Sequence, residues 1–223
     1  MSFFSDISAI QNIVYIFSSI LFISGIKMLG KEDTAVRGNF LSASAMFIAV
    51  AVTIINVVNP VIVLIGVSIG AVIGSLIALR VKMTSIPEMV ALFNGFGGLA
   101  TFFIAWSEFN AIPDNVFQFI VIMLTTYIGG VTFSGSIIAY GKLSEKLKVK
   151  KDSFVTKIFT TFFYASILFL VYSIGFTEII ELPINFYTVL LILTLLGGIG
   201  FVIPIGGGDM PVVISLLNSF SGI

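Results

Sequence analysis

The residues of this chain best suited to chemistry are two asparagines inside long apolar stretches. Asn94 lies six residues past Glu88, which is about 9 Å farther along a helix. Asn218 lies nine residues past Asp209, about 13 Å farther by the same rise. A buried amide is costly unless it is paired. Each asparagine therefore predicts either an interhelical hydrogen bond or a polar station on an ion or proton path, and the two amides are placed to face one another or share waters.

Two further stretches carry polar side chains. Thr132, Ser134 and Ser136 place three hydroxyls within five residues. Each hydroxyl can bond a carbonyl of its own helix, and together with neighbouring glycines the three can also line a hydrated path. In the other stretch, Asp209 follows three glycines, which predicts a helix cap beside a flexible hinge.

Residues that normally move protons or bind metals are missing from these stretches. The 223 residues contain no histidine and no cysteine, and no Asp, Glu, Lys or Arg lies well inside an apolar run. This composition excludes disulfides and thiol catalysis, and we predict no metal site. A proton relay normally uses an intramembrane ionisable group. Water or a partner chain must then carry the proton, unless nothing is transported.

The elements that position these side chains are predicted to be transmembrane helices. The chain is 58% hydrophobic and 10% charged, with a mean hydropathy of +1.16, whereas globular proteins are about 45–50% apolar and about 25% charged. A helix needs about 20 apolar residues to cross a bilayer. We predict an all-α polytopic bundle of about seven full spans and a truncated eighth run at 210–223. The full runs lie at 10–29, 38–58, 61–80, 86–106, 115–140, 154–176 and 186–204.

The distribution of charge predicts an orientation. All eleven Lys and Arg residues fall at alternate junctions between spans, and the opposite junctions carry only acidic charge. The positive-inside rule then places the N-terminus outside and the basic loops in the cytoplasm or its organellar equivalent. We expect a multi-pass protein of the cytoplasmic (inner) membrane. The basic run at 142–157 is either a topology signal that contacts anionic lipid or a docking surface for a soluble partner.

The net charge of zero predicts no nucleic-acid partner.

A ridge of small residues marks the run at 61–80. Gly66, Gly70, Gly74 and Ala78 recur every four residues. Small residues let helices approach closely where lipid supplies no hydrophobic drive. We predict that this ridge packs against another helix, with a pore lining as the alternative.

Three segments closely resemble the β subunit of proton-translocating nicotinamide nucleotide transhydrogenase. They are MTSIPEMVALFNGFGGLA at Met83–Ala100, GGVTFSGSIIAYGKL at Gly129–Leu143 and GGGDMPVVISLLNSFSG at Gly206–Gly222. The span count, the outside N-terminus and the basic inner loops also fit that family. The resemblance covers essentially the whole chain.

The resemblance implies a membrane domain that couples hydride transfer from NADH to NADP⁺ to inward proton movement. It implies an α subunit with an NAD(H) domain, two copies of each half, and NAD(H) and NADP(H) bound by the full complex but not by this chain. By motif match, Asn218 is the midplane polar residue, and Asp209 with Gly207 and Gly208 lies under the NADP(H) domain. Many family members have histidine where this chain has Asn94. This departure suggests that an α-subunit helix supplies the titrating group.

The resemblance also implies further helices and an NADP(H) domain beyond Ile223. We therefore expect residues 1–223 to be the transmembrane domain of an incomplete β subunit that is inactive alone. Two alternatives are a stand-alone small-solute transporter or channel, and a non-catalytic remnant. Transporters usually have discontinuous helices in matched halves, and this chain has one such break, at 206–209.

Overall fold

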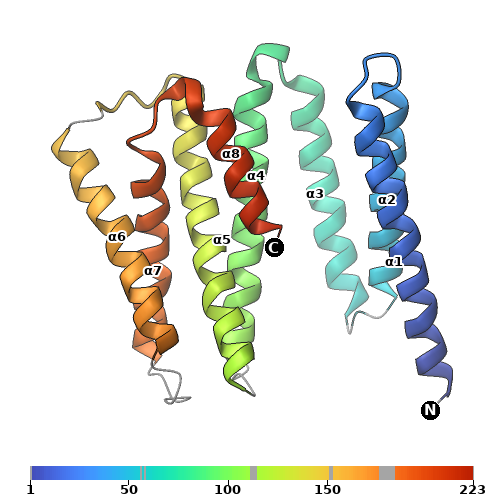
Figure 1. Ribbon diagram of the computed structural model, residues 1–223. Helices are drawn as coiled ribbons and strands as arrows, with labels where there is room; N and C mark the ends of the chain where they lie inside the picture. Colours follow the sequence, from blue (N-terminus) through green and yellow to red (C-terminus); the bar gives the residue numbers. More distant parts are fainter. Residues whose placement is uncertain are drawn as a thin grey trace. The chain divides into compact units, whose positions relative to one another are not determined.

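The computed structural model describes residues 2–55, 57, 59–110, 115–150, 153–175 and 184–222, and these ranges contain helices and no strand. The predicted all-α fold is thereby confirmed (Figure 1). Short 3₁₀ turns precede two of the helices, η1 (Met83–Ser85) before α4 and η2 (Gly207–Asp209) before α8. The α-helices are α1 (Ser2–Leu29), α2 (Ala35–Ile54), α3 (Pro60–Arg80), α4 (Ile86–Asn110), α5 (Val116–Leu143), α6 (Phe154–Gly175), α7 (Ile184–Val202) and α8 (Met210–Ser221).

The exact number of membrane crossings stays a prediction. Within the described ranges, six helices, α1 to α6, are long and apolar enough to cross a membrane. The last two helices form a pair bent by 110°, which adds a seventh crossing if the pair is one broken span. Pro204 lies at this break, where its missing N–H cannot continue α7. The orientation of the N-terminus stays a prediction.

The first compact unit, Met1–Arg80, is built around a hairpin of α1 and α2. These two helices approach closely at Gly25 and Gly38, because a Cβ atom on Gly38 would lie 2.7 Å from the carbonyl oxygen of Gly25. By contrast, α3 has no buried residue. A Cβ atom on any glycine of its ridge would meet no described atom within 4 Å. The packing role of the ridge residues Gly66, Gly70 and Gly74 therefore stays a prediction.

The second compact unit, Val81–Ile223, is organised around α5. This helix packs against α4 on one side and α7 on another, α6 covers α7, and α8 crosses both α4 and α5 (Figure 1). Glycines make these approaches close. A Cβ atom on Gly130 of α5 would lie 2.8 Å from the Cβ atom of Thr194 on α7. Small side chains thus permit the packing, as expected where helices associate in lipid.

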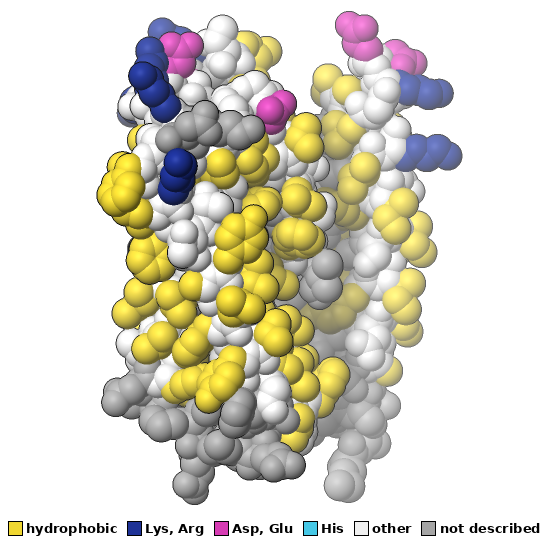
Figure 2. All heavy atoms as spheres, turned by 60° about the vertical axis from the view of Figure 1, so that its left-hand side comes forward, with side chains coloured by type: hydrophobic (Ala, Val, Ile, Leu, Met, Phe, Trp, Pro, Cys, Tyr) yellow, Lys and Arg dark blue, Asp and Glu magenta, His cyan; other side chains and the backbone are white. Residues whose placement is uncertain are grey.

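Charged and apolar side chains separate along unit 2. Figure 2 shows lysine side chains gathered at one end of this unit, with hydrophobic side chains over much of the face below. Leu168 and Val171 are among the apolar side chains of α6 that are largely exposed. A surface of this kind suits lipid rather than water, because lipid tails need no polar covering. This finding supports a multi-pass membrane protein.

A buried tyrosine joins α7 to α4 and α5 at the other end of unit 2. The ring of Tyr187 stacks on that of Phe109 with 3.7 Å between centroids. Its hydroxyl lies 2.7 Å from Oγ1 of Thr126, and that threonine hydroxyl donates to the carbonyl of Ile122. Tyr187 is 1% exposed, so its hydroxyl has lost contact with solvent and depends on this partner.

Tyr187→Phe is expected to lower the free energy of unfolding by about 1 kcal/mol, the usual net worth of a buried hydrogen bond. The matched control is Tyr164→Phe, because Tyr164 is 61% exposed. Thermal unfolding of the purified protein in detergent measures both variants. Equal unfolding temperatures for the two would contradict a stabilising role for the Tyr187 hydroxyl.

Candidate functional site

The centre of the candidate site is a hydrogen bond between α4 and α5. Nδ2 of Asn94 donates to Oγ of Ser136 over 3.0 Å. The two helices come this close because glycine follows Asn94: a Cβ atom on Gly95 would lie 3.1 Å from that of Ser136. Ser136 is fully buried, whereas Asn94 is only partly covered. The amide therefore has hydrogen-bonding capacity left over.

A second hydroxyl of α5 ties the site to α8. Thr132 lies one helical turn from Ser136, and its Oγ1 lies 3.4 Å from the backbone carbonyl oxygen of Leu217, to which it donates. Both hydroxyls therefore lie on one face of α5, between α4 and α8. Ser134 lies on another face, where it donates to the carbonyl of Gly130 over 2.9 Å and packs against Gly198 of α7. The structure thus separates Ser134 from the other two hydroxyls.

A groove of about 760 Å³ runs between α4 and α8. It brings together the two predicted asparagines, because both Asn94 and Asn218 line it, although no hydrogen bond joins their described side chains. Ser215 and Ser221 add hydroxyls, and the remaining lining is mainly apolar. No ionisable side chain lines the groove within the part of the chain that the structure describes.

The groove is suited to holding water rather than to acid–base catalysis. Amides and hydroxyls each donate and accept hydrogen bonds, but they do not change charge near neutral pH. Its volume exceeds the roughly 30 Å³ that one water occupies in the liquid.

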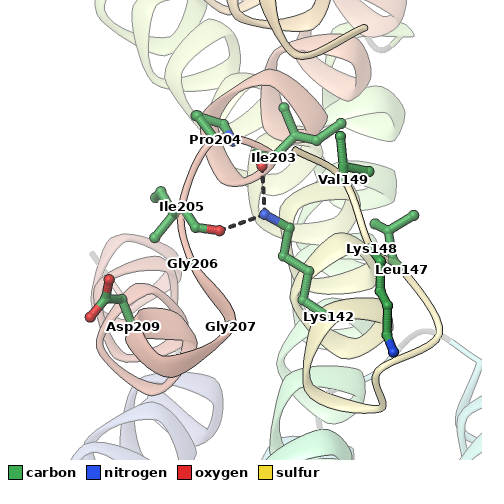
Figure 3. Close-up of a pocket in the computed structure, with 10 residues that line it drawn as sticks. All are labelled: Lys142, Leu147, Lys148, Val149, Ile203, Pro204, Ile205, Gly206, Gly207 and Asp209. Atoms are coloured by element: carbon green, nitrogen blue, oxygen red, sulfur yellow. Dashed lines mark hydrogen bonds between the residues drawn. The ribbon is translucent and has the colours of Figure 1, made fainter. Parts of the chain in front are cut away.

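A second pocket, of about 560 Å³, lies where α7 turns into α8 (Figure 3). It is lined by Lys142 and Lys148 on one side and by the turn from Ile203 to Gly207 on the other, with Asp209. Asp209, Gly207 and Gly208 are all exposed. The glycines keep negative φ values, so the turn does not depend on a left-handed backbone.

Asp209 does not cap α8 as the sequence predicts. The residue precedes the helix, but its side chain makes no capping hydrogen bond. The reason is its backbone, which has φ −91° and ψ −3° as the last residue of η2. A capping side chain requires extended backbone to reach back to the helix N–H groups. The carboxylate instead points away from Lys142 (Figure 3).

The sequence alone indicated Lys142 only as one of the basic residues that set the topology, and its contacts with backbone carbonyls were not predicted. Its Nζ donates to the carbonyl oxygens of Val202 at 3.3 Å and of Ile203 and Ile205 at 2.5 Å each. One signal was present in the sequence: among the lysines of the basic run at 142–157, Lys142 lies nearest to the end of the apolar run 115–140. The spacing of residues along the sequence does not show which atoms the amine of so long a side chain will reach.

Comparison with known proteins gives concordant matches. A family model described as NAD(P) transhydrogenase beta subunit matches residues 11–223. Two curated relatives from Rhodospirillum rubrum, each named NAD(P) transhydrogenase subunit beta, are 32% identical to the chain over 220 residues. The match covers 93% of this chain and 47% of each relative. The chain thus spans about half the length of the curated relatives that it matches.

Proposed function

This chain belongs to the NAD(P) transhydrogenase β-subunit family, and from that premise we propose that it is the membrane module of a proton-translocating transhydrogenase. In this role, residues 1–223 form the transmembrane domain that couples hydride transfer from NADH to NADP⁺ to inward proton movement. The complex lies in the inner membrane and includes an α subunit that binds NAD(H). NADP(H) is bound by a soluble domain of the complex, outside these residues, and the isolated chain is inactive.

The observation that carries this proposal is the polar groove between α4 and α8. Asn94 and Asn218 line one groove, and the Asn94–Ser136 hydrogen bond anchors it to α5. Polar side chains at this depth are costly and mark ion or proton pathways in membrane proteins. In the proposed mechanism, waters bound by the two amides carry the proton.

The titrating group of the path comes from a partner in this proposal. No ionisable side chain lines the groove among the described residues, and the chain has no histidine. We assign that group to a membrane helix of the α subunit. Replacing every membrane histidine of the α subunit should stop proton pumping by the purified complex, and continued pumping would exclude this source.

The exposed turn carrying Asp209, Gly207 and Gly208 is the proposed contact with the soluble NADP(H) domain. It lies at the end of unit 2 where the basic side chains Lys142 and Lys148 are found. Because α8 follows this turn directly, a movement of the turn is passed on to Asn218. Nucleotide state and the groove are coupled in this way.

The assay for this function uses inverted membrane vesicles that contain the whole complex. NADH is added with an NADP⁺ analogue, and reduction of the analogue is followed together with the internal pH. Inverted vesicles expose the cytoplasmic face, so inward proton movement takes protons out of the lumen. The expected result is reduction accompanied by alkalinisation of the vesicle interior. Reduction with no pH change would contradict proton coupling, and movement of a small solute without nucleotides would favour a stand-alone transporter.

The two faces of α5 give a further prediction for this assay. Ser136→Ala removes the partner of Asn94, and a lost hydrogen bond of about 1 kcal/mol corresponds to a roughly fivefold lower coupled rate. Ser134→Ala removes a bond within α5 only, so its rate should stay within about twofold of wild type. A larger loss for Ser134→Ala than for Ser136→Ala would contradict the placement of the path on the α4–α8 face.

A further inference from the structure

We propose that Lys142 is a positioning residue that ties the corner between α7 and α8 to the end of α5. The corner is the segment from Val202 to Asp209. By holding it, Lys142 sets where α8 presents Asn218. The positional part of this inference stands on the structure of unit 2, and its consequence for proton coupling rests on the proposed function.

The corner exposes backbone carbonyls that need donors. The last carbonyls of a helix have no α-helical partner, and Pro204 cannot supply an N–H to an upstream carbonyl. Of the three carbonyls that Lys142 reaches, that of Val202 also accepts from the backbone N–H of Ile205. The ammonium group of Lys142 has three N–H donors, and three carbonyls of the corner accept from it. Figure 3 shows the amine reaching the corner from the last turn of α5.

The charge of Lys142 fits this position. The carboxyl end of a helix carries a partial negative charge, which a cation stabilises. Lys142 is partly buried, and a hydrogen bond away from bulk water is stronger than one in it. Asp209 lines the same pocket but points away from the amine (Figure 3). With all three donors engaged by carbonyls, Lys142 holds the backbone and is not available to carry a transported proton or bind an anion.

Two polar contacts with α5 add to the apolar packing of α8, whose Met210, Val213, Ile214 and Leu217 lie in the core. One is the Lys142 attachment at the corner, just before the helix begins. The other is the hydrogen bond from Thr132 to the carbonyl of Leu217, the residue before Asn218. If the first contact is released, α8 can pivot about the second. Asn218 then moves relative to Asn94, which is held on α4 by its own bond to α5.

The test measures the position of α8 in the complex purified with its partners. This chain has no cysteine, so cysteines introduced here at Phe117 on α5 and Val212 on α8 provide two spin-label sites, once any accessible cysteines of the partners are replaced. Both positions are well exposed, at 76% and 73%. Pulsed electron–electron double resonance then gives the distribution of distances between the two spin labels.

Lys142→Met, which keeps the length but not the donors, should raise the population with displaced α8 about tenfold, as loss of a charge-assisted hydrogen bond implies. The matched control is Lys148→Met, because Lys148 lines the same pocket and is exposed. Its distances should equal those of wild type. Unchanged distances in Lys142→Met, or the same change in both variants, would overturn the inference.

If Lys142→Met does not accumulate in the membrane, Lys142→Gln is measured in its place. Its amide has two N–H donors rather than three and no charge, so a broadened distribution supports the inference and a wild-type distribution overturns it.

The same preparations give the functional consequence. The number of protons moved per hydride should fall about tenfold in Lys142→Met, while hydride exchange between bound nucleotides continues. If Lys142→Met changes the label distances but the wild-type complex shows no transhydrogenation, the positioning role stands and the proposed function is refuted. A distance change with an unaltered proton-to-hydride ratio would refute the link to coupling.

Discussion

Asn218→Leu should lower proton-coupled hydride transfer 10- to 100-fold, because a proton passing through the groove loses a charge-assisted hydrogen bond worth about 1.5–3 kcal/mol. The leucine keeps a similar volume, so the groove stays but loses one of its two amides. Asn94→Leu should have an effect of the same order. It also removes the bond to Ser136.

The control for Asn218→Leu is Ser219→Leu, one residue farther along α8. Ser219 is exposed but does not line the groove between α4 and α8, and its hydroxyl bonds the carbonyl of Ser215 within its own helix. Its coupled rate should remain near that of wild type in inverted vesicles. An unchanged rate in Asn218→Leu, at equal amounts of complex in the membrane, would remove Asn218 from the path.

Gly98→Ala should destabilise the contact between α4 and α5 by about 1–3 kcal/mol, the usual cost of overpacking a core. The added methyl group would lie 2.7 Å from the backbone nitrogen of Phe133 and 2.8 Å from Cβ of Thr132. Backbone atoms cannot rotate away, so the helices must separate. Because Thr132 holds α8, the same change should also lower the coupled rate.

The neighbouring glycine provides the control for this variant. A Cβ atom on Gly97 would meet no described atom within 4 Å, so Gly97→Ala should unfold at or slightly above the wild-type temperature. Thermal unfolding in detergent compares the two variants in one helix. If both lower the unfolding temperature equally, glycine is needed there for a reason other than contact with α5.

The helices themselves could be predicted from composition, because apolar runs of about 20 residues have few other structures open to them in lipid. The run at 61–80 corresponds closely to α3, Pro60–Arg80. Near the end of the chain, the helices were predicted but the angle between them was not. Runs 186–204 and 210–223 form α7 and α8, which join at a bend of 110°. Pro204 marks where α7 ends, but its chemistry does not fix the angle, which depends on packing against α5.

Part of the candidate site could also be predicted from the sequence. Depth along a helix was enough to propose that Asn94 and Asn218 meet, and the structure places both in one groove. Helical period also separates the hydroxyls, since Thr132 and Ser136 are one turn apart while Ser134 lies on the opposite side. Which of these faces meets α4 and which meets α7 is a property of tertiary packing.

The measurement that tests the central claim most directly uses the wild-type complex, purified whole and reconstituted into liposomes with its nucleotide-binding side outward. Reduction of an NADP⁺ analogue by NADH and the internal pH are recorded in the same sample. Protons should leave the liposome toward the nucleotide-binding side. We therefore expect the interior to become alkaline in fixed proportion to the hydride transferred, and this pH change to collapse on adding a protonophore while reduction continues. Hydride transfer with no change of internal pH would contradict it.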